Sequence, residues 1–391
     1  MFTFINGKII QPDGVLEGYC LTVESGRITG LYRDEGKHEG NIIDACGSYI
    51  SPGFIDIHVH GGGEGDFMDR DVQSVEKIIA VHTAHGTTGI YPTTLTCPEE
   101  EMYQAIEVIT DYKNLGLKGA EILGIHIEGP YLNVAQKGAQ DSKYLKMPKK
   151  EEYGRLLDYS KLIKRMTFAP ELEGGMELGR ELRERGIVAS IGHSEAEYED
   201  VVKAFEIGVR HVTHLYSGMQ GVHRVKGFRR LGIVECAYLL DEMTVEIIAD
   251  GCHLPIELLK LIYKIKGAER IALVTDAMRA AGRTEGESVL GSMENGQKVI
   301  LKDGVAFMPD FECFAGSIAT MDRLVRNMYR GAGVEIHNAV KMATETPASI
   351  MGCSGRKGSL EIGKDADVII FDDDINIKYV MTRGEEFLNT L

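Results

Sequence analysis

The sequence of 391 residues is short of positive charge, because 43 Lys and Arg stand against 59 Asp and Glu, for a formal net charge of −16. Nucleic acid and anionic membrane surfaces both attract proteins through basic patches. The charge balance therefore argues against nucleic acid and against a membrane as partners. A phosphorylated small molecule stays possible, since one local arginine can bind phosphate whatever the total charge.

Paired cysteines and long apolar runs are also missing. The seven cysteines are odd in number, scattered along the chain and form no CxxC pair, which favours reduced thiols and a cytoplasmic location over a disulfide framework. No apolar run reaches the ~18 residues that a membrane-spanning helix needs. The start, MFTFINGKII, shows no cationic segment ahead of an apolar one, so we expect no signal peptide.

Eight short apolar segments alternate with helical patterns between residues 53 and 278. Residues 75–86 and 195–208 have apolar positions at helical spacing, and Ser194 is the expected N-cap of the second helix. The segments are apolar on both faces, as buried parallel strands are. Eight strand–helix repeats predict a (β/α)8 TIM-like barrel, and a doubly wound open sheet is disfavoured because no GxGxxG follows the first strand. The predicted strands are residues 53–60, 88–95, 122–129, 165–171, 187–194, 209–216, 244–251 and 271–278.

The two ends of the chain differ from its middle. Residues 1–51 and 355–391 contain short strand patterns with glycine turns and no helical periodicity. Two β-rich ends that flank a barrel predict a small β-sandwich domain built from both termini. The barrel itself is then expected to occupy residues 52–354.

Histidines and carboxylates cluster at the ends of the predicted strands. His58 and His60 lie side by side, because alternate residues of a strand point to the same side, and we expect the glycines of residues 61–63 to leave room for a substrate. A single buried histidine is more often a hydrogen-bonded core residue. Placement at the ends of five separate strands favours a metal site instead, since active sites of such barrels lie at the carboxyl ends of the strands. Imidazoles with carboxylates suit one or two divalent Zn, Fe, Co or Mn ions. The predicted ligands are His58, His60, Glu128, His193, His214 and Asp276.

The order HxH, Glu, His, His and a late Asp resembles the amidohydrolase superfamily. Within it, the chain is similar to the N-acetylglucosamine-6-phosphate deacetylase family, in stretches such as PGFIDIHVHGGGEGDFMD (52–69), GIHIEGPYLNVAQKGAQD (124–141), THLYSGM (213–219) and LVTDAMRAAG (273–282). The resemblance covers nearly the whole chain. It implies a metal-dependent hydrolase that removes acetate from N-acetylglucosamine 6-phosphate, and a homodimer with phosphate contacts near the subunit interface.

The resemblance also implies roles for individual residues. Glu128, His193 and His214 would hold the main ion, and the two histidines of the HxH pair would hold a second one. Asp276 resembles the catalytic aspartate, and His253 resembles a second catalytic residue that contacts the acetamide. The implied substrate-binding residues are Ala139, Gln140, Ser217, Gly218, Arg224, His253, Phe314, Ala315 and Gly316, with Arg224 meeting the phosphate.

Three departures from the family pattern leave the sugar open. The family usually has Asn-Ala where this chain has Ser217-Gly218, His where it has Gln140, and REPG where it has RVKG (224–227). N-acetylgalactosamine 6-phosphate is therefore an alternative substrate. A different amidohydrolase, acting on N-acyl amino acids or cyclic amides, is another alternative, although such enzymes often carry a carboxylated lysine and no Lys ends a predicted strand here. A non-catalytic relative would be expected to have lost ligands, and the full set is present.

Overall fold

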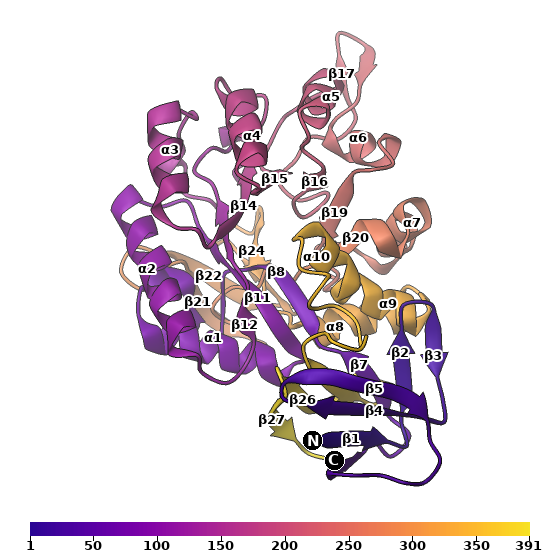
Figure 1. The fold of residues 1–391 in the computed structure, drawn as a ribbon. Coiled ribbons are helices and arrows are strands. Elements are labelled where there is room, and N and C mark those ends of the chain that lie inside the picture. The colour runs from indigo at the N-terminus through magenta and orange to yellow at the C-terminus, as the bar shows by residue number, and fades with distance from the viewer.

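Eight parallel strands form the centre of the molecule in the computed structural model, which describes residues 1–391 (Figure 1). Neighbouring strands pair in chain order around the barrel, and a parallel bridge between Val59 and Ala277 closes the ring. All eight predicted strands and the predicted barrel are confirmed. The strands are β8 (Phe54–Val59), β11 (Thr87–Thr94) with the short β12 (Glu121–Ile122) beside it, β13 (Ile125–Glu128), β14 (Ile163–Phe168), β15 (Val188–Ile191), β16 (His211–Val212), β19 (Thr244–Ile247) and β20 (Ile271–Leu273).

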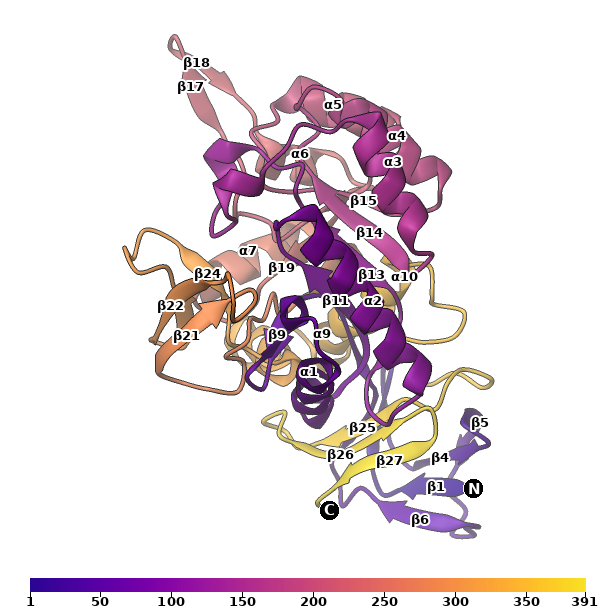
Figure 2. The same cartoon turned by 90° about the vertical axis from the view of Figure 1, so that its left-hand side faces the viewer.

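Helices cover the outside of the barrel (Figures 1 and 2). In α1, Asp71 caps the first turn by accepting a hydrogen bond from the Ser74 backbone N–H, and Val75, Ile78 and Ile79 bury one face. No helix combines the length and the apolar character needed to cross a lipid bilayer. The helices are α1 (Val72–Ala84), α2 (Glu99–Leu115), α3 (Lys150–Tyr159), α4 (Gly175–Glu184), α5 (Tyr198–Glu206), α6 (Ile233–Leu239), α7 (Ile256–Lys266), α8 (Met321–Arg326), α9 (Ile336–Ala343) and α10 (Glu345–Ile350).

The predicted start of α5 is wrong. Glu197, not Ser194, is its N-cap residue. The Ser194 hydroxyl donates instead to Glu171 Oε2 at 2.6 Å and accepts from the Ala196 backbone N–H at 3.0 Å. Because a serine hydroxyl favours such local turns as readily as a helix start, the helix begins only at Tyr198.

The two ends of the chain form a small sandwich of two sheets, which contains both termini (Figure 1). Its interior joins side chains of both sheets, such as Phe4 and Leu21 from one and Ile50 and Val368 from the other. The predicted β-sandwich is confirmed, and we keep 1–51 with 355–391 as the proposed domain limits. The first sheet has the order β5 (Arg27–Arg33), β4 (Tyr19–Glu24), β1 (Phe2–Ile5), β6 (Asn41–Asp44), and the second β27 (Glu385–Asn389), β26 (Ile377–Thr382), β25 (Val368–Phe371), β7 (Tyr49–Pro52), β2 (Lys8–Gln11), β3 (Gly14–Leu16).

Two β insertions in the barrel were not predicted. A two-stranded hairpin of β17 (His223–Val225) and β18 (Phe228–Arg230) projects away from the body of the molecule (Figure 2). After β20, an antiparallel sheet of four strands follows beside the barrel, and Figure 2 shows it apart from the sandwich. Its strands are β21 (Gly286–Leu290), β22 (Gln297–Lys302), β23 (Val305–Phe307) and β24 (Phe314–Ser317).

Candidate metal centre and active site

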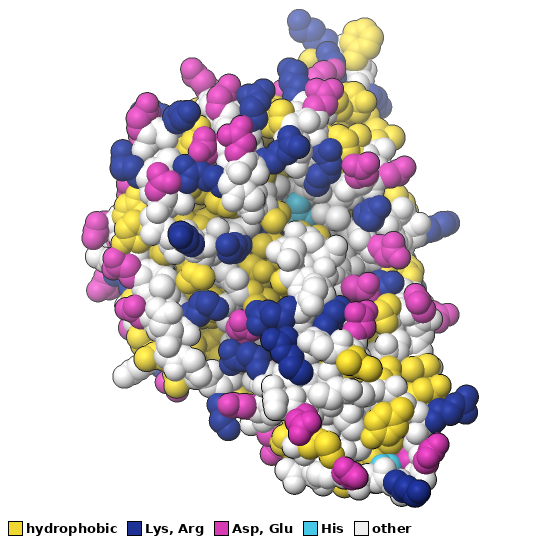
Figure 3. All heavy atoms as spheres, viewed as in Figure 1, with side chains coloured by type: hydrophobic (Ala, Val, Ile, Leu, Met, Phe, Trp, Pro, Cys, Tyr) yellow, Lys and Arg dark blue, Asp and Glu magenta, His cyan; other side chains and the backbone are white.

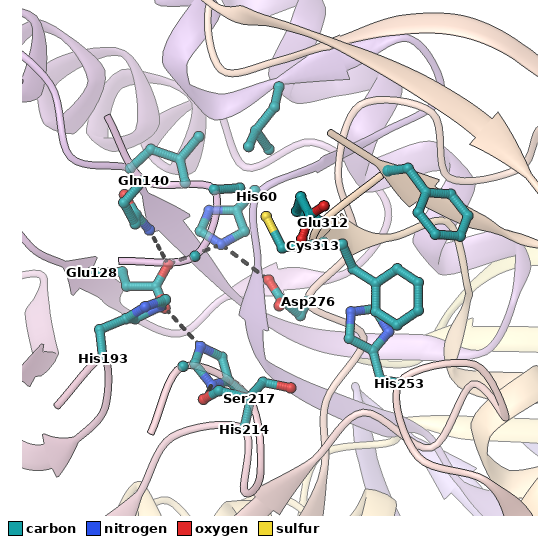
Figure 4. Close-up of a pocket in the computed structure, with 18 of the residues that line it drawn as sticks. His60, Glu128, Gln140, His193, His214, Ser217, His253, Asp276, Glu312 and Cys313 are labelled. Carbon is teal, nitrogen blue, oxygen red and sulfur yellow. Dashed lines mark hydrogen bonds and ion pairs between the residues drawn. The ribbon is translucent and has the colours of Figure 1, made fainter. Parts of the chain in front are cut away.

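A cavity of about 350 Å³ opens at the carboxyl ends of the barrel strands. Such a volume is within the range of small-molecule sites. Predicted ligands and predicted substrate contacts meet in its wall, and Figure 4 shows their side chains pointing toward a common centre. The predicted residues that line it are His60, Glu128, Ala139, Gln140, His193, His214, Ser217, Gly218, His253, Asp276, Phe314 and Gly316.

Glu128 lies at the middle of the predicted ligand set. Its Oε1 atom is 3.3 Å from His193 Nε2, 3.1 Å from His214 Nε2 and 3.4 Å from His58 Nε2. Its Oε2 atom is 3.3 Å from His60 Nε2. Two groups of imidazole and carboxylate atoms thus share His58: one with Glu128 and His214, the other with His60 and Asp276.

Asp276 completes the second of these groups. Its Oδ1 atom lies 3.1 Å from His60 Nε2 and 3.6 Å from His58 Nε2. The two imidazole nitrogens are themselves 3.3 Å apart. The side-by-side arrangement that the HxH spacing predicts is therefore present.

Each ligand imidazole is held through its other nitrogen, Nδ1. His58 Nδ1 lies 3.2 Å from the Glu246 carboxylate. For the other three rings the acceptor is a backbone carbonyl oxygen, which lies 3.2 Å from His60, 2.8 Å from His193 and 3.1 Å from His214. Because only a protonated Nδ1 can donate to an oxygen, each Nε2 lone pair is left facing the centre.

The backbone turns three of these side chains into the cavity. His193, His214 and Asp276 have φ values of 48°, 25° and 45°, in the left-handed region that non-glycine residues rarely occupy. All three follow the last residues of their strands. Strain of this kind persists where the surroundings fix it and is concentrated at functional sites.

The pKa shifts of His60 and Glu128 show that the centre of the site favours positive charge. Burial alone would lower the pKa of His60, but the carboxylates of Asp276 and Glu128 outweigh it and raise that pKa to about 9. Burial alone would raise the pKa of Glu128, but His58 and the neighbouring imidazoles bring it well below its usual range. The carboxylates are thus ionised, and their negative charge favours a cation among the imidazoles.

The donor set fits a divalent ion. Ligand atoms about 2.0–2.1 Å from a tetrahedral ion lie roughly 3.4 Å from one another, and the nitrogen–oxygen separations here are 3.1–3.6 Å. The ligands are imidazoles and carboxylates without a thiolate, which suits Zn, Fe, Co or Mn. The predicted ligands therefore lie at separations that one or two ions would require.

His253 lies on the other side of Asp276 in the cavity (Figure 4). Its Nδ1 atom is 2.9 Å from Asp250 Oδ2, and its ring rests against Phe314 with 4.7 Å between centroids. Burial alone would raise the pKa of Asp250, but the hydrogen bond with His253 outweighs it and lowers that pKa. An ionised Asp250 fixes the ring, whose Nε2 has no partner within the chain.

Sequence analysis missed the buried pair that supports His58. Glu246, on β19, accepts from His58 and forms an ion pair with Arg165 of β14, and both side chains are fully buried. Arg165 also donates to Ser190 Oγ at 3.2 Å and Thr213 Oγ1 at 3.0 Å inside the barrel. Burial alone would raise the pKa of Glu246, but Arg165 and His58 bring it well below its usual range. The available signal was a charged residue within each of the two strand patterns: Glu246 alone in one and Arg165 beside Lys164 in the other.

Gln140 has a different neighbour from the one expected. Its Nε2 atom donates to Glu128 Oε2 at 2.8 Å, and its Oε1 accepts from the Thr96 backbone N–H at 2.8 Å. The amide is 5% exposed. Gln140 therefore orients a predicted metal ligand, in addition to lining the cavity.

Two predicted substrate contacts lie outside the cavity. Ala315 is fully buried in the core of the β21–β24 sheet. Arg224 is exposed on β17 of the projecting hairpin and does not line the cavity of its own chain.

The expectation for the three glycines after β8 is wrong. None of them lines the cavity. A Cβ atom on Gly61 would lie 2.4 Å from the Gly65 carbonyl oxygen, and one on Gly62 would lie 2.8 Å from His82 Nε2. The glycines allow close packing of chain segments behind the site and do not make room for a substrate.

An aromatic wall, not predicted beyond Phe314, closes the side of the cavity opposite the metal ligands. Phe307, Phe311 and Phe314 pack edge to face or tilted, with 5.0–5.3 Å between the centroids that meet at Phe307. All three line the cavity and come from the β21–β24 insertion. The insertion thus supplies an apolar face that limits access of water.

Comparisons with known proteins agree with this geometry. The model of the amidohydrolase family matches residues 49–387. The N-acetylglucosamine-6-phosphate deacetylase of Vibrio furnissii is 34% identical over 383 residues, which cover 97% of this chain and 92% of the relative. The crystal structure of N-acetylglucosamine-6-phosphate deacetylase from Pasteurella multocida superposes with a TM-score of 0.91 at 30% identity, over 99% of this chain and all of the other. A mutant of the enzyme from Mycobacterium smegmatis, in complex with N-acetyl-D-glucosamine-6-phosphate, has a TM-score of 0.90 at 28% identity, with 99% of each chain covered.

Proposed function

The chain belongs to the amidohydrolase family, and from this membership we propose that it is a metal-dependent deacetylase that converts N-acetylglucosamine 6-phosphate into glucosamine 6-phosphate and acetate. The observation that carries the proposal is the convergence of four Nε2 atoms on two carboxylates at the cavity that His253 also lines, with His58 buried behind the cavity wall. The Vibrio furnissii relative and the Pasteurella multocida structure, which match this chain over nearly its full length, carry this activity in their names, whereas a relative of 31% identity from Escherichia coli O157:H7 is named an N-acetylgalactosamine-6-phosphate deacetylase.

We propose that Glu128, His193 and His214 hold the main ion and that His58 and His60, with Asp276, hold a second. A divalent ion in such a site supplies a Lewis acid that polarises a carbonyl and lowers the pKa of water from about 15.7 towards about 7. The hydrogen bonds at each Nδ1 hold the imidazoles in the tautomer that binding requires.

Asp276 is suited to move the proton. Burial alone would raise its pKa, but His58 and His60 outweigh this and lower it, so the carboxylate is ionised at neutral pH. Its side chain is 13% exposed and faces the cavity. Asp276 accepts a proton from the attacking water and delivers it to the amine, which must be protonated to leave.

His253 positions and polarises the acetamide. Donation from Nε2 to the carbonyl oxygen, as negative charge develops there, requires an imidazolium, and Asp250 accepts the Nδ1 proton of that ring. The phenylalanine wall excludes bulk water, which strengthens this interaction.

For the phosphate, we propose that Arg224 of the partner subunit in a homodimer meets the ligand. The hairpin projects from the body, and its apolar side chains are open to contact: Phe228 is 75% exposed and Val225 is 38% exposed. An arginine binds phosphate through two parallel charge-assisted bonds. An exposed hairpin of this kind is suited to reach a second copy of the chain. No arginine lines the cavity of either copy from its own chain, so the partner's Arg224 would supply the missing positive charge.

We also propose a cytoplasmic location. All seven cysteines are free in the structure, which supports work in a reducing compartment.

The substrate is tested by acetate release from three compounds by the metal-loaded enzyme. We expect N-acetylglucosamine 6-phosphate to be hydrolysed with a higher kcat/KM than its galacto epimer or unphosphorylated N-acetylglucosamine. Faster turnover of the galacto epimer would change the sugar and keep the mechanism. Equal or faster turnover of the unphosphorylated sugar would contradict the phosphate assignment.

A further inference from the structure

A second cavity, of about 420 Å³, opens at the opposite end of the barrel, among the amino ends of β15, β16, β19 and β20. Three arginines line it: Arg183 from α4, Arg210 just before β16, and Arg270 just before β20. In Figure 3, Lys and Arg side chains lie above and to the right of a hollow between α4 and α10 in which a histidine side chain is visible. The chain as a whole is strongly acidic, so this basic concavity is a local feature.

Backbone carbonyls hold the three guanidinium groups, and only Arg210 also meets a carboxylate. Arg183 Nη1 donates to the Ile207 carbonyl at 3.3 Å and Arg270 Nε to the Asp241 carbonyl at 3.1 Å, and neither arginine has an ion pair. Arg210 donates to the Phe205 carbonyl and has one ion pair, with the exposed Glu242 at 3.4 Å. Carbonyls orient the arginines without neutralising them, so their remaining N–H groups and their charge are available to a ligand.

The chain also makes room for one of these arginines. A Cβ atom on Gly208 would lie 2.7 Å from Arg183 Cδ. Gly208 has a φ of 100°, which side-chain-bearing residues rarely adopt. A glycine at this turn therefore permits the Arg183 side chain to lie along the cavity.

At its inner end the cavity reaches His211. This side chain is 1% exposed, its Nδ1 atom is 2.7 Å from Thr244 Oγ1, and its Nε2 atom faces Glu246 Oε1 inside the barrel at 3.8 Å. The hydroxyl of the exposed Ser349, on α10, is part of the wall as well. The one acidic residue of the wall, Glu269, is exposed and lies 3.7 Å from Lys341.

We propose that this amino-end cavity binds a phosphate group, either as inorganic phosphate or as part of a small phosphorylated metabolite. Three arginines against one exposed carboxylate give the wall a net positive charge, and guanidinium groups pair with phosphate oxygens through parallel charge-assisted hydrogen bonds. The volume is sufficient for a ligand larger than the phosphate group itself. The site is separate from the metal centre and does not depend on the proposed deacetylase activity.

The test is calorimetric titration of the metal-loaded protein with inorganic phosphate. The double variant Arg183→Gln, Arg270→Gln removes two of the unpaired cations, and hydrogen bonds to charged groups are strong enough that we expect binding at this site to weaken at least about tenfold. Arg180→Gln is the matched control, because Arg180 lies on the same helix, pairs with Glu177 and does not line the cavity. The control is expected to bind phosphate as the wild type does.

A second variant tests the site independently, in case the double variant does not fold. Ser349→Glu places a carboxylate at an exposed position of the wall and is expected to weaken phosphate binding while deacetylase kcat stays unchanged. A parallel titration with glucose 6-phosphate, which has no amide to hydrolyse, distinguishes the two sources: tighter binding than inorganic phosphate indicates a phosphorylated metabolite, and weaker binding indicates the free ion. Identical phosphate isotherms for the wild type, the double variant and Ser349→Glu would overturn the proposal.

Discussion

The mouth of the barrel contains the groups proposed to cleave the amide, and the β17–β18 hairpin contains the arginine proposed to bind the phosphate. The two regions differ in burial and in how their side chains are held. At the mouth, the predicted ligands are almost fully buried, and each imidazole is fixed by a hydrogen bond at its second nitrogen. On the hairpin, Arg224 is exposed and no hydrogen bond or ion pair holds its side chain.

The difference follows from what each group has to do. Bond cleavage requires groups placed in advance within a fraction of an ångström, which a rigid barrel provides. Recognition of a phosphate at the edge of a site tolerates a mobile arm, provided that the arm finds its place when a partner or ligand is bound. The chain therefore contains the chemistry in one copy, whereas we propose that phosphate recognition is shared between two.

The largest effect is expected from loss of the ligands at the mouth. The triple variant Glu128→Ala, His193→Ala, His214→Ala removes every proposed contact of the main ion, and we expect it to lose that ion and essentially all acetate release. His337→Ala, on α9 and outside every group of possible metal ligands, is the control. Elemental analysis of the purified proteins measures the metal, and full retention in the triple variant would show that the ion lies elsewhere.

A smaller loss is expected when only the proton carrier changes. Asp276→Asn keeps the shape of the side chain but cannot accept a proton, so kcat should fall by roughly 10²–10⁴, the range of general acid–base catalysis. Steady-state kinetics with a parallel metal determination checks this. Turnover within a few-fold of the wild type, with the ion still bound, would assign the proton transfer to another group.

On the hairpin, Arg224→Ala should affect one substrate selectively. Loss of a charge-assisted contact of about 1.5–3 kcal/mol corresponds to roughly 10–10² in kcat/KM for the phosphorylated sugar. Turnover of the unphosphorylated sugar should be unchanged, because the mouth is intact. An equal loss for both sugars would instead indicate that the hairpin supports the fold.

Mixing two impaired chains tests whether Arg224 acts on the partner's site. A mixed dimer of Asp276→Asn and Arg224→Ala has one complete site, made of the Arg224→Ala cavity and the other chain's arginine. Random exchange should restore activity to about a quarter of the wild-type level, since half of the dimers are mixed and each has one working site. No gain after subunit exchange would place the arginine in its own chain's site.

The smallest effect is expected from Gln140→Ala. The ligands themselves remain, but Glu128 loses the hydrogen bond that orients it, and outer contacts of this kind are worth about 10–100-fold in metal affinity. We expect a value near the lower limit, measured by competition with a chelating dye. An unchanged metal affinity would leave Gln140 with a role toward substrate only.

Strand ends could be predicted because they follow from simple periodicities. An apolar run that ends in HVH or in THL places its last side chains at the barrel mouth whatever the surroundings are. The tethers of His60, His193 and His214 could not be predicted, since backbone carbonyls accept the hydrogen bonds and every residue has one.

The elements that sequence analysis missed also lack a distinctive local pattern. The hairpin and the four-stranded insertion consist of strands of three to six residues with turns between them, and their local pattern does not differ from that of a loop. The partnership of Arg165 and Glu246 joins strands 81 residues apart, so no local pattern reveals it. The clustering of the imidazoles and carboxylates was predictable, whereas the contacts that hold them in place were not.

The central claim is that the cluster at the barrel mouth performs metal-dependent deacetylation, and reconstitution tests it most directly. Protein stripped of metal by a chelator is titrated in turn with Zn, Fe, Co and Mn while acetate release from N-acetylglucosamine 6-phosphate is recorded. We predict negligible release without metal and a rise in proportion to added ion that stops at one or two ions per chain. Release at the full rate from the metal-free protein would contradict the account.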